Sequence, residues 1–110
     1  MSFKLKLFFG FFLFIVVVFV ATLKINYQST INQSAVKQAQ LLYQQEKSQG
    51  ITFVGQCLSN DLMPDWVVDI VHSPRTESDN NPSNQCEAYL NGSAHHFVEL
   101  DTKGNLVRVQ

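Results

Sequence analysis

The stretch Leu7–Leu23, LFFGFFLFIVVVFVATL, has no charged residue, and only Gly10 and Thr22 in it are not apolar. A helix over these residues is about 25 Å long, and about 31 Å long if it begins at Phe3. The longer helix matches the ~30 Å hydrocarbon core of a bilayer. The stretch therefore predicts a single transmembrane helix that anchors the chain in a lipid bilayer.

The lysines around this stretch predict its orientation. Lys4 and Lys6 lie on its N-terminal side, together with the amino terminus, and Lys24 alone follows it directly. Positive charge collects on the cytoplasmic side of membrane helices. We therefore expect residues 1–6 in the cytoplasm and residues 25–110 in the periplasm, with the helix in a bacterial inner membrane.

A cleavable signal peptide is the alternative, because it also begins with a short basic region. Its apolar core spans about 7–15 residues and ends at a small-x-small site. The run in this chain is longer, and FVATLK at residues 19–24 has no Ala-x-Ala pattern. The sequence therefore favours an anchor that is not removed.

A second, amphipathic helix is expected within residues 24–50. No Pro or Gly lies between Ala21 and Gln49, so the membrane helix either continues unbroken or restarts after a short polar stem. Gly50 is a natural stop. The apolar stripe either packs on the domain's own sheet or forms a coiled coil, and its length of under two heptads favours the sheet. The stripe consists of Ile31, Ala35, Val36, Ala39, Leu42 and Tyr43.

Residues 51–110 predict a small antiparallel sheet of about four or five strands, because β-branched and aromatic runs alternate with turn-forming residues. With the preceding helices, the fold class is α+β. Ser59–Asp61 is expected to be a turn, and Ser73–Gln85, with two prolines, an exposed loop. The expected strands are Ile51–Leu58, Trp66–His72, Cys86–Leu90, Ala94–Leu100 and Leu106–Val109.

The two cysteines of the chain, Cys57 and Cys86, predict one structural disulfide. Both lie in the part that we expect to be exported, where the compartment is oxidising, and they do not form a C-x-x-C motif. Closing a loop of about 30 residues would stabilise so small a domain by roughly 3.5 kcal/mol. An intermolecular bridge or two free thiols are the alternatives.

Loop lengths decide which residues of the last three expected strands share a face, because side chains alternate along a strand. A three-residue loop at Asn91–Ser93 and a four-residue loop at Asp101–Gly104 bring the most apolar residues together. That face is the expected core, and includes Val98, Leu100, Val107 and Val109.

The opposite face mixes aromatic and charged side chains. It is either an ordinary half-exposed sheet surface, stabilised by cross-strand pairs, or a surface that binds a partner. The candidate partner-binding residues are Tyr89, His95, Phe97, Glu99 and Arg108.

The sequence predicts no catalytic, cofactor-binding or metal site. His95 and His96 are neighbours on an expected strand, so they point to opposite faces and do not bind one ion together. No glycine-rich phosphate loop is present, and no strand–turn–helix pattern places a serine beside a base. Residues 25–110 carry a net charge of −4, whereas nucleic-acid binding requires a clustered basic surface. We expect neither an enzyme nor a nucleic-acid-binding protein.

Two partial resemblances accompany these patterns. An apolar helix that runs into an amphipathic one, followed by a disulfide-bearing sheet, resembles a type IV pilin and would imply a self-assembling subunit. Pilins carry a glutamate inside the apolar helix, whereas the first acidic residue of this chain is Glu46. Separately, FVELDTKGNLVRV at Phe97–Val109 is similar to the closing hairpin of PepSY-type domains.

These expectations together describe a membrane-anchored accessory module that binds another envelope protein. A self-associating, pilin-like subunit that forms homo-oligomers and an immunity-type inhibitor of a periplasmic toxin are the alternative functions. The chain is expected to divide into a cytoplasmic N-terminus (1–6), a transmembrane anchor (7–23), a stem with an amphipathic helix (24–50) and an extracytoplasmic sheet domain (51–110).

Overall fold

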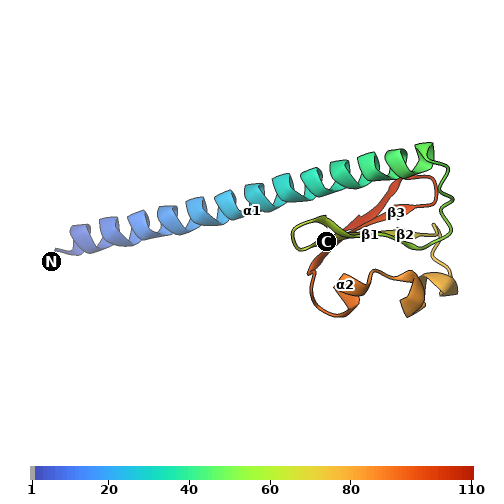
Figure 1. Ribbon diagram of the computed structural model, residues 1–110. Helices are drawn as coiled ribbons and strands as arrows, with labels where there is room; N and C mark the ends of the chain where they lie inside the picture. Colours follow the sequence, from blue (N-terminus) through green and yellow to red (C-terminus); the bar gives the residue numbers. More distant parts are fainter. Residues whose placement is uncertain (1) are drawn as a thin grey trace. The chain divides into compact units, whose positions relative to one another are not determined.

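The computed structural model describes residues 2–110, and its longest element is helix α1, Phe3–Ser48 (Figure 1). The helix is continuous, so there is no break at the polar stem. Two compact units divide the chain: one extends up to Ile31, and the other, called the module below, from Asn32 to Gln110.

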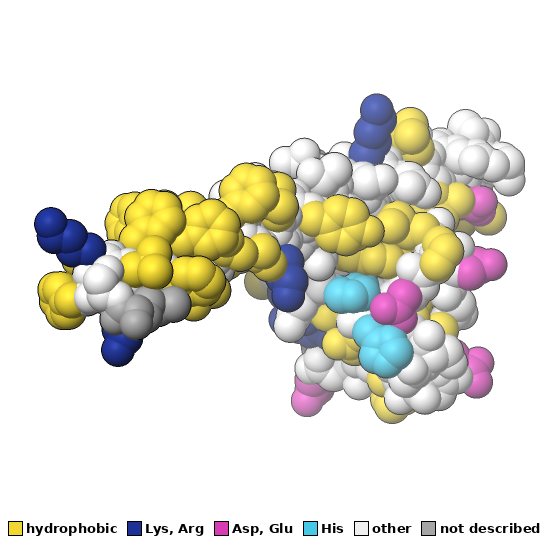
Figure 2. Space-filling model, turned by 90° about the vertical axis from the view of Figure 1, so that its left-hand side faces the viewer, with side chains coloured by type: hydrophobic (Ala, Val, Ile, Leu, Met, Phe, Trp, Pro, Cys, Tyr) yellow, Lys and Arg dark blue, Asp and Glu magenta, His cyan; other side chains and the backbone are white. Residues whose placement is uncertain are grey.

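The N-terminal part of α1 is apolar on all sides. Its large side chains from Phe3 to Leu23 are exposed, and Figure 2 shows apolar side chains gathered over this segment, with lysines near its end. By length and composition this helix is able to cross a membrane. A helix that is hydrophobic all round suits lipid better than water.

The module contains a four-stranded sheet in the order β1-β2-β3-β4. The pairs β1–β2 and β3–β4 are antiparallel, and the central pair β2–β3 is parallel. Two short 3-10 helices and a short helix lie between β2 and β3 in the chain. The elements are β1 (Cys57–Met63), β2 (Trp66–Val71), η1 (Glu77–Asn80), η2 (Pro82–Asn84), α2 (Glu87–Leu90), β3 (His96–Asp101) and β4 (Leu106–Val109).

The sheet is mixed, so the prediction of a purely antiparallel sheet is wrong. Residues Glu87–Leu90 of the expected strand Cys86–Leu90 form helix α2 instead, with Cys86 as its N-cap. The predicted disulfide is confirmed, and it ties Cys86 to Cys57 at the start of β1. With this segment outside the sheet, β2 becomes the neighbour of β3. Residues 72–95 supply the long crossover that a parallel pair requires.

The expected strand Ile51–Leu58 and the expected turn Ser59–Asp61 are also wrong. Residues 51–56 form no strand, and β1 begins at Cys57 and runs through the expected turn. Gly55 has φ +99°, a left-handed conformation that interrupts an extended chain. A side chain at Gly55 would meet Asp79 and His72, so this bend brings the segment against the crossover.

Helix α1 covers one face of the sheet within the module, and the crossover elements lie on the other face (Figure 1). Ala35 and Ala39 have no exposed surface and Tyr43 is 2% exposed, at a spacing of four residues. Within the module the amphipathic stripe therefore packs on its own sheet, and its other members there, Val36 and Leu42, are partly buried. Ile31, also partly buried, belongs to the N-terminal unit.

The central strands bury side chains on both faces, as is usual for a parallel pair. Under α1 lie three pairs of register partners: Trp66 and His96, Val68 and Val98, and Ile70 and Leu100. Towards the crossover lie Val67 and Phe97, which form a second apolar cluster with Cys86 and Ala94, and the acidic pair Asp69 and Glu99.

Strand β4 contributes less to the core than predicted. Val98 faces Val109 and Glu99 faces Arg108, but an irregularity then pairs Leu100 with Leu106. Val107, an expected core residue, is 44% exposed because β4 is an edge strand and the shift in register turns it away from the buried layer.

Candidate functional site

The two arginines of the chain converge on one carboxylate, that of Glu99. Arg75 Nη1 donates a hydrogen bond to Glu99 Oε2 at 2.7 Å. Arg108 approaches Oε1 with Nε at 2.8 Å and Nη2 at 2.7 Å. Glu99 is 5% exposed, whereas the two arginine side chains are 41% and 58% exposed. The buried carboxylate therefore holds two guanidinium groups at the surface of the module.

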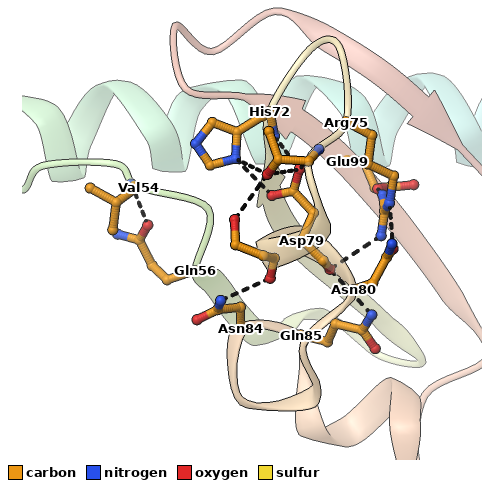
Figure 3. Close-up of polar contacts among 11 residues, drawn as sticks. Val54, Gln56, His72, Arg75, Asp79, Asn80, Asn84, Gln85 and Glu99 are labelled. Atoms are coloured by element: carbon orange, nitrogen blue, oxygen red, sulfur yellow. Dashed lines mark hydrogen bonds and ion pairs between the residues drawn. The ribbon is translucent and has the colours of Figure 1, made fainter.

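The crossover positions Arg75 by several polar contacts (Figure 3). Its Nε donates to Asn80 Oδ1 at 2.9 Å, and its Nη2 donates to the carbonyl oxygen of Asp79 at 3.3 Å. Gln85 Nε2 donates to the same carbonyl oxygen at 3.3 Å. Contacts within its own loop therefore fix the position of Arg75, in addition to its ion pair with Glu99.

Asp79 is the buried centre of this loop, with 2% of its surface exposed. The backbone N–H groups of Thr76 and His72 donate to its Oδ2 at 2.8 and 3.1 Å, and His72 Nδ1 lies 2.9 Å from Oδ1. Burial raises the pKa of Asp79, but these hydrogen bonds outweigh it and lower the pKa to about 2. Asp79 is therefore ionised at neutral pH and holds the loop together.

Asp69 is the register partner of Glu99 on the parallel strand β2, so two carboxyl groups lie side by side in the sheet. Its Oδ1 is buried and has no hydrogen-bond partner among the described residues. Burial, with the nearby charge of Glu99, raises the pKa of Asp69 to about 7. A substantial fraction of Asp69 is therefore protonated at neutral pH.

Asp69, Arg75, Glu99 and Arg108 border a small surface cavity of about 130 Å³. Phe97 forms one apolar wall; the Tyr89 ring meets it edge-on at 5.1 Å, and the Arg108 guanidinium lies 4.7 Å from its centroid. Asp69, Arg75 and Glu99 form the polar wall. The arrangement can bind the polar end of a side chain while the apolar stem of that side chain packs against the two rings.

The structure brings together four of the five predicted partner-binding residues. Tyr89, Phe97, Glu99 and Arg108 line the cavity, although Tyr89 comes from helix α2 rather than from a strand. Phe97 and Glu99 are buried, so they support the surface more than they form it. His95 does not line the cavity: it precedes β3, and its Nδ1 lies 2.6 Å from Asp65 Oδ1.

Sequence reasoning missed Asp69 and Arg75 as site residues. Asp69 had a detectable signal, because it is the one charged residue within the apolar strand Trp66–Val71. Arg75 had no such signal, because it lies in a loop whose sequence indicates only that the loop is polar.

No protein-family model, curated protein or solved structure matches this chain.

The titration of Asp69 gives the first prediction. In the unfolded chain this carboxyl ionises near pH 3.8, whereas in the folded module it keeps its proton to about pH 7. Between these values the folded state binds more protons, so ionisation opposes folding as the pH rises. We expect Asp69→Asn to be more stable than the wild type at pH 8, by up to about 4 kcal/mol for a shift of this size, and nearly equal at pH 4.

Urea unfolding of the full chain in detergent, followed by the fluorescence of Trp66, measures this difference. Asp61→Asn, at an exposed position of β1, is the control and should keep the pH dependence of the wild type. Parallel stability curves for Asp69→Asn and the wild type from pH 4 to 8 would contradict the assignment.

Proposed function

We propose that this protein is a single-pass component of the bacterial inner membrane whose periplasmic module binds another envelope protein. The observation that carries the proposal is the change of character along α1. Its first part exposes apolar side chains on all sides, and its last part packs on a folded, disulfide-bonded module. The first part of α1 suits a lipid environment. The module on which the last part packs presents a structured surface, and it follows the apolar part directly in the chain.

The membrane part of the proposal draws on charge and redox chemistry. Lys4 and Lys6 precede the apolar segment and favour a cytoplasmic N-terminus. The Cys57–Cys86 disulfide suits an oxidising compartment such as the periplasm.

The binding part draws on the surface around the two arginines. Tyr89 is 42% exposed, and Leu106 and Val107 of the neighbouring edge strand are 45% and 44% exposed. Tyrosine and arginine are enriched among the residues that dominate binding energy, particularly where apolar contacts exclude water around them. We therefore place the partner contact on this surface, with Tyr89 and Arg108 as its principal residues.

Alkaline phosphatase fused after Gln110 tests the topology, because this enzyme is active only after export. We expect an active fusion that stays with the membrane fraction, since an uncleaved anchor retains it. The same fusion joined after Lys6 should be inactive. An active fusion released into the soluble periplasm, with a mature N-terminus near residues 22–26, would show a cleaved signal peptide instead.

Site-specific photo-crosslinking tests the partner surface in living cells. A crosslinking amino acid at Tyr89 should give one discrete protein adduct, and Arg108→Glu in the same chain should abolish it. The same probe at Gln44, on the exposed side of α1, is the matched control. Adducts of equal intensity from both positions, or none from Tyr89, would contradict the proposed surface; an adduct of twice the chain mass would identify self-association.

A further inference from the structure

We infer that the cavity beside Glu99 is a carboxylate-binding pocket that receives an acidic side chain of the partner protein. The inference rests on the proposed function, because it names the chemical group by which the partner is recognised. Unused hydrogen-bond donors, the charge balance and the size of the cavity support this pocket.

Both arginines keep hydrogen-bond donors for a ligand. A guanidinium has five N–H donors. Arg75 uses three of its donors, on Asn80, Asp79 and Glu99. Arg108 directs Nε and Nη2 to Glu99 Oε1, and its Nη1 has no hydrogen-bond partner among residues 2–110. Because both side chains are substantially exposed, the remaining donors can reach an incoming oxygen.

The charge balance of the cavity favours an anion. Two guanidinium groups face the single negative charge of Glu99 while Asp69 is protonated, which leaves one positive charge in excess. Asp79 does not line the cavity, and its carboxylate is occupied by Thr76 and His72 on the far side of the loop. A cationic group would approach both guanidinium groups and be repelled, so an amine is the weaker candidate.

Asp69 makes the charge of the cavity depend on pH. It lines the cavity, but its Oδ1 is buried and does not reach an incoming group. When Asp69 ionises, its negative charge cancels the excess positive charge and repels the ligand, so affinity should fall as the pH rises above about 7. His72 contacts Asp79 and does not line the cavity.

The size of the cavity fits one side chain. A volume of about 130 Å³ is enough for a carboxylate and a short aliphatic stem, but not for a folded segment. The stem would pack on Phe97 and Tyr89, whose rings form the apolar wall. The exposed residues of β4 would then contact the surrounding surface of the partner.

The two arginines give a direct readout, because only they produce arginine Nε–Hε signals in a ¹⁵N NMR spectrum of the full chain in detergent micelles. We expect N-acetylglutamate N-methylamide to shift both signals with a millimolar Kd at pH 6, and to bind about tenfold more weakly at pH 8. The matched probe, N-acetylglutamine N-methylamide, should shift neither. In Asp69→Asn the affinity should be the same at both pH values.

Equal shifts with the glutamine probe, or no shift of either arginine with the glutamate probe at about 100 mM, would overturn the carboxylate pocket. These outcomes are separate from the proposed function. A specific adduct from Tyr89 combined with no glutamate response would leave the partner surface in place and remove only the carboxylate. Loss of the adduct combined with a normal glutamate response would instead identify a site for a free carboxylate.

Discussion

Replacing Tyr43 by alanine should lower the free energy of unfolding of the module by about 4 kcal/mol. Tyr43 is 2% exposed, and its ring stacks on Phe53 with centroids 4.3 Å apart. Its hydroxyl donates to the carbonyl oxygen of Thr102 at 2.8 Å. Truncation would therefore open a cavity between α1, the segment before β1 and the β3–β4 turn, and would leave a carbonyl oxygen without its partner.

Tyr43→Phe separates the two effects, because it removes only the hydroxyl and should cost about 1 kcal/mol. Tyr27→Ala, at a 70% exposed position of the same helix, should leave the stability of the module almost unchanged. Urea unfolding of the full chain in detergent, monitored by Trp66 fluorescence, gives all three values. A cost below 1 kcal/mol for Tyr43→Ala would mean that α1 is not an integral part of the module.

Removing the disulfide should destabilise the module by about 3.5 kcal/mol, since the bridge closes a loop of about 30 residues and restricts the unfolded chain. It joins Cys57 to Cys86, which are separated by 29 positions. It also holds the crossover on β1, because Cys86 belongs to the apolar cluster of Val67 and Phe97. Cys57→Ala with Cys86→Ala should therefore loosen the wall of the cavity as well as lower the stability.

The reductant dithiothreitol provides the control for this variant. The wild type in reductant should approach the stability of the double-alanine variant, and the variant itself should not respond to reductant. A variant as stable as the oxidised wild type would show that packing alone holds the crossover in place.

Local patterns were sufficient for several elements of this fold. The apolar run, the stripe with Ala35 and Ala39, and the strand beginning at Trp66 depend on residues close in sequence, and each was predicted. The pair Glu99 and Arg108 was predicted to share a face for the same reason, because a short turn connects β3 to β4. The register of β3 and β4 beyond that pair was not predicted, because an irregularity in an edge strand leaves no periodic signal in the sequence.

The site itself depends on contacts between distant segments. Asp69 meets Glu99 only because β2 and β3 pair in parallel, and Arg75 meets Glu99 only because the crossover returns over the sheet. Neither arrangement is recorded in local periodicity, and a five-residue segment such as Cys86–Leu90 has no strong preference for strand or helix.

The sequence by itself determined the apolar helix, the amphipathic stripe, the prediction of a bridge between the only two cysteines and the absence of charge clusters typical of nucleic-acid binding. Each of these depends on composition or on spacing within a few turns of the chain. Only the tertiary structure decided the parallel pairing of β2 and β3, the helical form of Glu87–Leu90 and the meeting of both arginines at Glu99. The physical reason is that the disulfide and the buried layer under the crossover select one long-range arrangement among several that satisfy the same local preferences.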